Sequence, residues 1–203
     1  MTTLSTLLKG LAIGFSIAAP VGPIGVLCIR TTLVRGRIAG LCAGLGAAVA
    51  DGCYGLVAAG GLTAVLHALV ALDVPLRLLG GAFLVFLGLS ALRASPPGES
   101  APPPATGLAR VFITTFLLTL SNPMTILSFV ALLGAVGASA AGGPFALVAG
   151  VFLGSALWWL TLSLLVGLFR ARVAPRVMRG VNVGAGALIA GFGAWVLVGL
   201  SRG

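Results

Sequence analysis

The stretch Phe15-Ser16-Ile17-Ala18-Ala19-Pro20-Val21-Gly22-Pro23 interrupts a long apolar segment with two prolines and a glycine. A second apolar segment is interrupted at the matching place in the other half of the chain, in Leu118-Thr119-Leu120-Ser121-Asn122-Pro123. Proline lacks a backbone N–H and clashes with the preceding helical turn, so both segments are expected to be broken helices. Because a break inside lipid frees carbonyl groups that need partners, paired breaks indicate a solute site near mid-membrane.

The composition indicates the environment of the chain. Hydrophobic residues make up 59% of the 203 residues and charged residues only 7%. A soluble domain has roughly a quarter charged residues, so this chain could not cover a water-facing surface and is expected to be one multi-spanning membrane domain. The net charge of +9 does not indicate a nucleic-acid binder, because the arginines lie at the ends of apolar segments.

Six segments have the length of about 20 apolar residues that a helix needs to cross a bilayer. They are Leu4 to Ile29, Ile38 to Leu62, Pro75 to Leu92, Val111 to Val136, Phe145 to Phe169 and Val181 to Leu200. None shows the strict alternation of a membrane strand, so the expected fold class is an all-α polytopic membrane protein. The connector Arg93 to Arg110 is rich in proline and predicts an exposed linker, which divides the chain into repeats at about 4–92 and 110–200.

The basic residues beside the segments predict the orientation in the membrane. Nine lie on one side, which is expected to be cytoplasmic: Arg30, Arg35, Arg37, Arg93, Arg110, Arg170, Arg172, Arg176 and Arg179. Three lie on the other side: Lys9, Arg77 and Arg202. Both termini then face outward. Since each half has three helices, the halves would enter the membrane from opposite sides and form an inverted repeat with broken helices 1 and 4.

Aligning Pro20 with Pro123 places Asp51 of the first half opposite Gly154 of the second, beside Ser155. Glycines recur at helical spacing within the segments, which predicts close packing of helices. They are Gly36, Gly40, Gly44, Gly80, Gly88, Gly150 and Gly154. A less regular set, Gly184, Gly186, Gly191 and Gly193, is a candidate for contacts in a homodimer.

Asp51 is the only acidic residue within a predicted span. A carboxylate at that depth is costly unless it faces water or a partner. It could bind a substrate ammonium or exchange a proton, or it could make a structural hydrogen bond to backbone freed by a helix break; the two roles need not exclude each other. Tyr54 follows within one helical turn and could close a pocket around it.

Each helix break exposes the N-terminal end of a half-helix, whose unpaired amides attract a carboxylate. Asn122 adds an amide donor and acceptor at the second break. Further polar groups on the fourth segment are Thr115, Thr119, Ser121, Thr125 and Ser128. Together these features predict a site for a zwitterion, with proton coupling at Asp51. The candidate substrate-binding residues are Pro20, Gly22, Pro23, Asp51, Tyr54, Ser121, Asn122 and Pro123.

Other kinds of site are not indicated. The adjacent Trp158 and Trp159 are interpreted as packing or interfacial residues. Cys28, Cys42 and Cys53 have no metal-ligand spacing and are expected to be free thiols. No hydrolase triad, HExxH motif or phosphate loop occurs in the sequence, so neither an enzyme nor a cofactor is expected.

Four features carry a resemblance to a known family: Pro20-Val21-Gly22-Pro23, the glycine-rich stretch Arg35 to Gly46, Asp51, and Leu120-Ser121-Asn122-Pro123. In their order and spacing the chain resembles the LysE/RhtB family of amino-acid exporters over essentially its whole length. The resemblance implies export of amino acids or small relatives, driven by the proton gradient, across a bacterial inner membrane. Val21 departs from the family's PGP triplet, and Met124 stands where the family has a lysine.

Two alternatives remain open at this point. One is a divalent-cation permease of the cadmium type, which belongs to the same superfamily and would need several carboxylates, cysteines or histidines to converge. The other is a membrane assembly protein that transports nothing. If the chain is an amino-acid exporter, its expected partners are a small-molecule substrate, protons, the lipid bilayer and a second copy of the chain.

Overall fold

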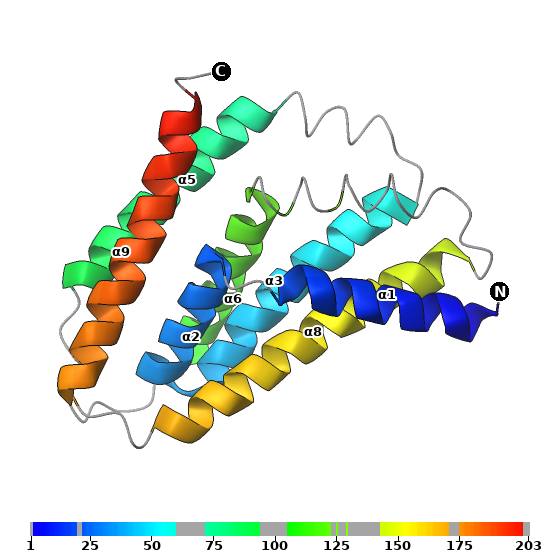
Figure 1. Cartoon of the computed structure of the whole chain (residues 1–203), viewed down its shortest axis with the longest axis horizontal. Coiled ribbons are helices and arrows are strands. Elements are labelled where there is room, and N and C mark those ends of the chain that lie inside the picture. The colour runs from blue at the N-terminus through cyan, green and yellow to red at the C-terminus, as the bar shows by residue number, and fades with distance from the viewer. Residues whose placement is uncertain are drawn as a thin grey trace.

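A computed structural model describes residues 2–19, 22–59, 72–93, 105–122, 125, 129, 143–170 and 175–200. Their helices are α1 (Thr3–Ala18), α2 (Pro23–Arg35), α3 (Arg37–Ala59), α5 (Asp73–Arg93), α6 (Ala105–Leu120), α8 (Pro144–Phe169) and α9 (Pro175–Leu200) (Figure 1). No strand occurs in this part of the chain. The prediction of an all-helical protein is confirmed.

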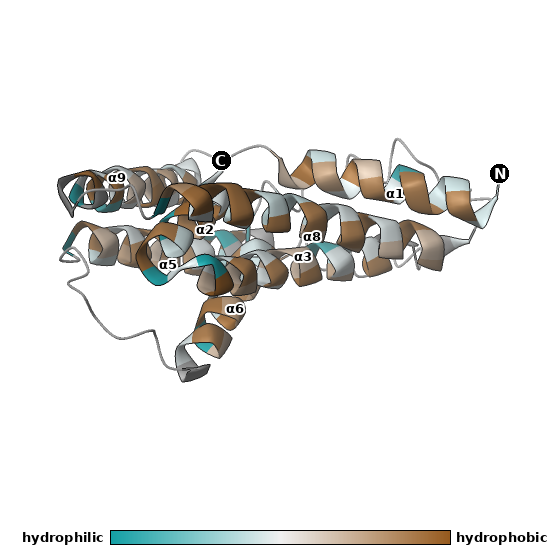
Figure 2. Cartoon of the chain, turned by 90° about the horizontal axis from the view of Figure 1, so that it is seen from below, coloured by the Kyte–Doolittle hydropathy of each residue, from teal (hydrophilic) through white to brown (hydrophobic). Residues whose placement is uncertain are grey.

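The surface of the molecule suits a lipid environment. Large apolar side chains such as Leu79, Leu188 and Trp195 are exposed, whereas Asp51 and Asn182 are buried. Apolar residues accordingly dominate the helices in Figure 2. Three described stretches are long and apolar enough to cross a membrane, and α1 with α2 makes a fourth if the pair is one bent span. They are Arg37–Val57, Phe145–Phe169 and Arg179–Gly199. The arrangement with six spans stays a prediction.

The first predicted break lies between α1 and α2. α1 ends at Ala18, and α2 begins at Pro23 with its axis bent by 81° from that of α1. Gly22 precedes the new helix in an extended conformation, and the fixed φ of Pro23 suits a first helical position. The first segment is therefore two helices, as predicted, while Pro20 and Val21 lie outside the described residues.

The predicted connector from Arg30 to Arg37 is wrong, because α2 continues through Arg35. Only Gly36 separates α2 from α3, with a φ of +96° that favours glycine. Its N–H donates to the carbonyl of Thr32 at 2.9 Å. From α8's end, Arg170 Nε donates to the carbonyl of Leu33 at 3.0 Å, which satisfies a carbonyl at the C-terminus of α2.

Two further helix starts differ from the prediction. α6 begins at Ala105 rather than at Val111, so the end of the predicted linker is helical, and residues 94–104 lie outside the described residues. α9 begins at Pro175 rather than at Val181. In both cases the helix extends beyond the apolar residues, because arginine has good helix propensity and lipid burial is needed only over the span.

The predicted role of glycine in helix packing is confirmed at several contacts. A Cβ added to Gly154 of α8 would lie 2.0 Å from the carbonyl oxygen of Leu11 in α1. One added to Gly44 of α3 would lie 2.4 Å from Cβ of Trp159, and one added to Gly88 of α5 would lie 2.5 Å from N of Ala190 in α9. These glycines let α8 lie along α1 and α3, and α5 along α9 (Figure 1).

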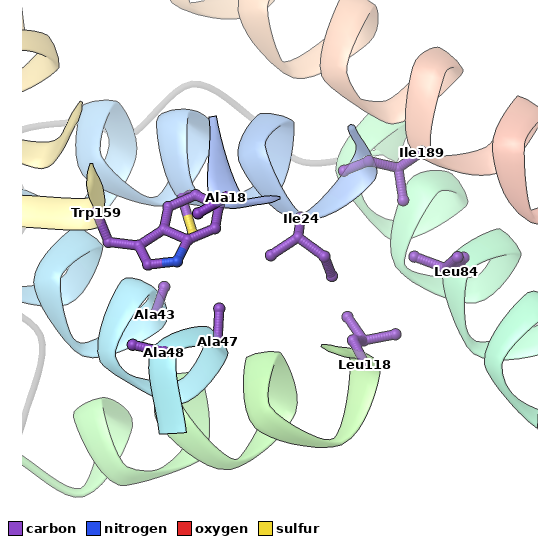
Figure 3. Packing of buried hydrophobic residues seen from close by; sticks show 10 residues of the cluster. Ala18, Ile24, Ala43, Ala47, Ala48, Leu84, Leu118, Trp159 and Ile189 are labelled. Carbon is purple, nitrogen blue, oxygen red and sulfur yellow. The ribbon is translucent and has the colours of Figure 1, made fainter. Parts of the chain in front are cut away.

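The buried apolar core lies around the start of α2. Figure 3 shows Trp159 and Ala18 on one side of Ile24, and Leu84 and Ile189 on the other. Ile24 thus joins residues of α1 and α8 to residues of α5 and α9. The residues that flank the first break, Ala18 and Ile24, therefore belong to the buried core.

Candidate functional site

A cavity of about 310 Å³ lies at the start of α2, where six helices contribute to its wall. Its described lining consists of Ile17, Ala18, Gly22, Pro23, Ile24, Gly25, Ala47, Asp51, Thr119, Asn122, Thr125, Trp159 and Phe192. Four of the predicted site residues therefore line one cavity: Gly22, Pro23, Asp51 and Asn122. Pro20 and Pro123 lie outside the described residues.

Asp51 is held by a short chain of hydrogen bonds. It is only 4% exposed, and Ser155 Oγ donates to its Oδ2 at 2.6 Å. Trp159 Nε1 donates in turn to Ser155 Oγ at 3.1 Å. One turn of α8 thus orients the carboxylate of α3, with a hydrogen bond of the charge-assisted kind when Asp51 is ionised. The hydrogen bond that holds Asp51 therefore comes from a side chain, whereas the structural alternative expected backbone freed by a helix break.

Sequence reasoning missed Ser155 and interpreted Trp159 as a packing or interfacial residue and not as part of the site. The alignment of the two halves had placed Ser155 beside the position opposite Asp51. That signal, a small polar residue within an apolar segment, could have identified it. Trp159 instead both packs in the core and lines the cavity.

The N-terminus of α2 opens onto the same cavity. Gly22 makes no side-chain cap, and Pro23 has no N–H. The amides of Ile24 and Gly25 belong to the first turn of the helix, whose N–H groups have no acceptor within the helix itself. The first bond of the helix is the one from Val26 N to the carbonyl of Gly22 at 3.0 Å. This end of α2 carries the positive end of the helix dipole and can accept an anion.

The end of α6 supplies neutral polar groups. Thr119 and Asn122 line the cavity, together with Thr125 beyond them. Thr119 Oγ1 donates to the carbonyl of Thr115 at 2.9 Å, which leaves its oxygen able to accept a hydrogen bond. α6 ends at Leu120, and the N–H of Asn122 donates to the carbonyl of Thr119 at 3.2 Å, so the last turn closes with a bond three residues back.

Two predicted site residues lie beside the cavity and not in its described lining. Tyr54 donates its hydroxyl to the carbonyl of Leu120 at 2.5 Å and stacks on Phe129 with ring centroids 5.4 Å apart. It thereby satisfies one of the carbonyls at the end of α6. Ser121 donates to the carbonyl of Leu117 at 2.7 Å and lies against Gly80 of α5.

Metal ligands do not gather in the part of the chain that the structure describes, where no three His, Cys, Asp or Glu side chains come together. Cys28, Cys42 and Cys53 are free thiols, as predicted, and Cys28 is fully buried.

Comparison with known proteins decides the family. Residues 15–199 match the sequence model of the family described as "LysE type translocator". The chain belongs to this family. LysE proteins are transporters and not enzymes, so this member is a membrane transporter. The family resemblance seen in the sequence is confirmed.

Relatives in three bacteria share most of the length of the chain. It is 28% identical to "Putative amino acid efflux protein YcgF" of Bacillus subtilis, over 92% of both chains. It is 31% identical to an uncharacterized membrane protein of Pseudomonas aeruginosa over 90% of both chains. It is 30% identical to the uncharacterized membrane protein YahN of Escherichia coli, over 81% of this chain and 76% of that one. No solved structure matches the chain.

Proposed function

We propose that this LysE protein is a secondary active transporter that exports amino acids or related small zwitterionic metabolites by proton antiport with alternating access. It would work in a bacterial inner membrane with both termini outside. The observation that carries the proposal is a single cavity lined by both the N-terminus of α2 and the carboxylate of Asp51.

The two ends of the cavity wall are complementary to the two charges of an amino acid. The amides of Ile24 and Gly25, with Asn122, would hold the α-carboxylate, and Asp51 would hold the ammonium. Ligand pockets span about 300–1,000 Å³. The cavity, at about 310 Å³, lies at the lower end of this range and suits a solute of amino-acid size.

Asp51 offers a physical basis for coupling. A carboxylate that is only 4% exposed needs a compensating positive charge, which a substrate ammonium or a proton can each supply. Because one site cannot hold both at once, binding of one favours release of the other. Such competition at a site with alternating access produces antiport.

The contact between Asp51 and Ser155 supports the inverted repeat. The alignment of Pro20 with Pro123 places these two residues at nearly equivalent positions of α3 and α8. Residues that meet near a two-fold axis are expected to be equivalent, and their side chains are 2.6 Å apart. The contact of α1 with α8 is likewise matched by a contact of α6 with α3.

The direction of transport rests on the name of the Bacillus subtilis relative, which is described as an efflux protein. Neither alternative is favoured by an observation. Among the described residues no cluster of metal ligands speaks for a cadmium-type permease. A cavity with a buried carboxylate is not a feature that an assembly protein requires.

Asp51→Asn tests the proposal in proteoliposomes that contain the purified full chain. With an imposed pH gradient, we expect amino-acid flux in the wild-type protein and none in the variant, since the amide keeps the shape of the side chain but cannot bind a proton. Asp73→Asn is the matched control, because α5 contributes no residue to the described lining. Unchanged proton-driven flux in the Asp51 variant would remove Asp51 from the mechanism.

A further inference from the structure

The side chains around the two charged ends of the site indicate which substrate side chain it accepts. We propose that the transported solute is a neutral amino acid with an apolar side chain, of the leucine, methionine or phenylalanine kind. This proposal rests on the proposed function and narrows it from amino acids in general to one chemical class.

The first argument is the scarcity of charge. The whole sequence has three acidic residues, and Asp51 is the only one in the described lining. If Asp51 pairs with the α-ammonium, a cationic side chain such as that of lysine has no acid left to pair with. The described lining also contains no Lys, Arg or His for an anionic side chain. An unpaired charge beside the buried Asp51 and the apolar lining is disfavoured.

The residues that are next to the described lining in the sequence add no charged group to it. Pro20 and Val21 follow α1, and Pro123 and Met124 follow Asn122. The sequence from Asn122 to Phe129 contains no charged residue. Whatever these residues contribute to the wall, they add no ionic partner for a substrate side chain.

The second argument is the apolar remainder of the wall. Ile17 of α1, Ile24 of α2 and Phe192 of α9 line the cavity and offer no hydrogen bond. Trp159 adds a large ring whose only donor is already used on Ser155. Ile24, Trp159 and the small Ala47 come from three different helices, and Figure 3 shows them close to one another.

The polar groups of the lining, in contrast, bind the α-carboxylate and the α-ammonium that every amino acid has. The amides of α2 and Asn122 serve the carboxylate. The two remaining hydroxyls of the described lining, Thr119, which donates to its own helix, and Thr125, lie within three residues of Asn122 in the sequence and away from the apolar residues Ile17, Ile24 and Phe192. A substrate hydroxyl or amide placed against Ile17, Ile24 and Phe192 would lose its hydrogen bonds to water without replacement. An apolar side chain loses none and gains contact, so it is favoured.

The test measures the initial rate of counterflow for single labelled amino acids in proteoliposomes with the full chain. The set is leucine, methionine, phenylalanine, serine, lysine and glutamate, each at the same low concentration. Discrimination by apolar pockets is about 10–200-fold. We therefore expect the three apolar amino acids to be transported at least about tenfold faster than the other three.

Phe192→Ala probes the wall directly, because it removes the apolar side chain that α9 contributes. It should lower the rate for leucine about tenfold relative to wild type and narrow the difference between leucine and serine. Phe192→Leu keeps the wall apolar and should keep the preference, even if Phe192→Ala fails to fold. Leu188→Ala is the matched control on the same helix, since Leu188 is 64% exposed and does not line the cavity.

The outcomes separate this inference from the proposed function. Faster transport of lysine, glutamate or serine than of leucine would overturn the apolar class and leave an amino-acid transporter. A leucine-to-serine ratio that is the same in wild type and in both Phe192 variants would remove Phe192 from the specificity wall. Failure of all six amino acids to exchange would contradict the proposed function itself, and the narrower inference with it.

Discussion

The glycines between α1 and α8 allow a quantitative test of how the fold holds the site. Gly14 and Gly154 face each other's helices so closely that an added Cβ would lie 2.0 Å from the carbonyl oxygen of Val151 or Leu11, respectively. Gly184 and Gly191 of α9 are also helical, but an added Cβ meets nothing within 4 Å at either position. The four sites therefore differ in steric environment and not in secondary structure.

Alanine at each position should separate two effects. Replacing a helical glycine by alanine favours the helix by roughly 1 kcal/mol at all four sites. At Gly14 and Gly154 the new methyl group meets backbone atoms, which cannot rotate away, and overpacking of this kind costs about 1–3 kcal/mol. Because the helix term is common to all variants, the difference between the two pairs should be about 1–3 kcal/mol.

The assay is equilibrium unfolding of the purified protein in mixed micelles with increasing SDS, followed by helical circular dichroism. We expect Gly14→Ala and Gly154→Ala to unfold at lower SDS than wild type. Gly184→Ala and Gly191→Ala should unfold at the same or a higher SDS fraction. Equal transitions in all four variants would refute the close approach of α1 and α8.

Three further predictions concern hydrogen bonds in the cavity, beside it, and between α2 and α9. Ser155→Ala should reduce proton-driven flux at least several-fold, because it removes a bond to a charged group worth about 1.5–3 kcal/mol, whereas Ser155→Thr should retain flux. Tyr54→Phe should destabilise the protein by about 1 kcal/mol in SDS unfolding, because it removes the hydrogen bond to the carbonyl of Leu120. Since this bond lies beside the cavity, substrate affinity should not change. A large loss of affinity would place Tyr54 in the site. Arg30 Nε donates to Asn182 Oδ1 at 3.0 Å. A double-mutant cycle of Arg30→Gln and Asn182→Leu in SDS unfolding should therefore give a coupling energy of about 0.5–3 kcal/mol. Additive effects of the two substitutions would contradict the bond.

The sequence predicts well those features that follow from the residue types themselves, whatever their partners in the fold. Proline at positions 20 and 23 disrupts helical hydrogen bonding wherever the chain goes, so the first break was predictable. The all-α class follows from composition, because lipid leaves no water to satisfy an open backbone. Asp51 was identifiable because a single acid within an apolar segment has few explanations.

Helix ends were less predictable, since partners that are distant in sequence determine them. The C-terminus of α2 depends on Arg170, which reaches the carbonyl of Leu33 from the end of α8. In the sequence, Arg30, Arg35 and Arg37 lie between two apolar segments and therefore predict a connector. The starts of α6 and α9 were missed for a different reason, because these helices extend beyond the apolar segments that hydropathy detects.

The cavity wall was the least predictable feature, because hydropathy does not tell which face of a membrane helix points inward. Trp158 and Trp159 are adjacent and chemically identical, yet Trp159 lines the cavity and Trp158 packs edge-on against Phe15 with ring centroids 5.2 Å apart. Phe192 lies in the last helix, far in sequence from either break. The packing of α9 against α5 and α2 brings it to the site.

The position of α2 links the site to the rest of the fold. Its first residues form one wall of the cavity and its last residues are held by Arg170, while Arg30 in between is bonded to Asn182 of α9. α1, on the other side of the break, is fixed to α8 through the backbone contacts of Gly14 and Gly154. A displacement of α2 relative to α1 must therefore be absorbed between the end of α1 and the start of α2, where Ala18 and Gly22 line the cavity. Since Ile24 and Phe192 line the cavity from α2 and α9, the width of the site depends on how these two helices are held together.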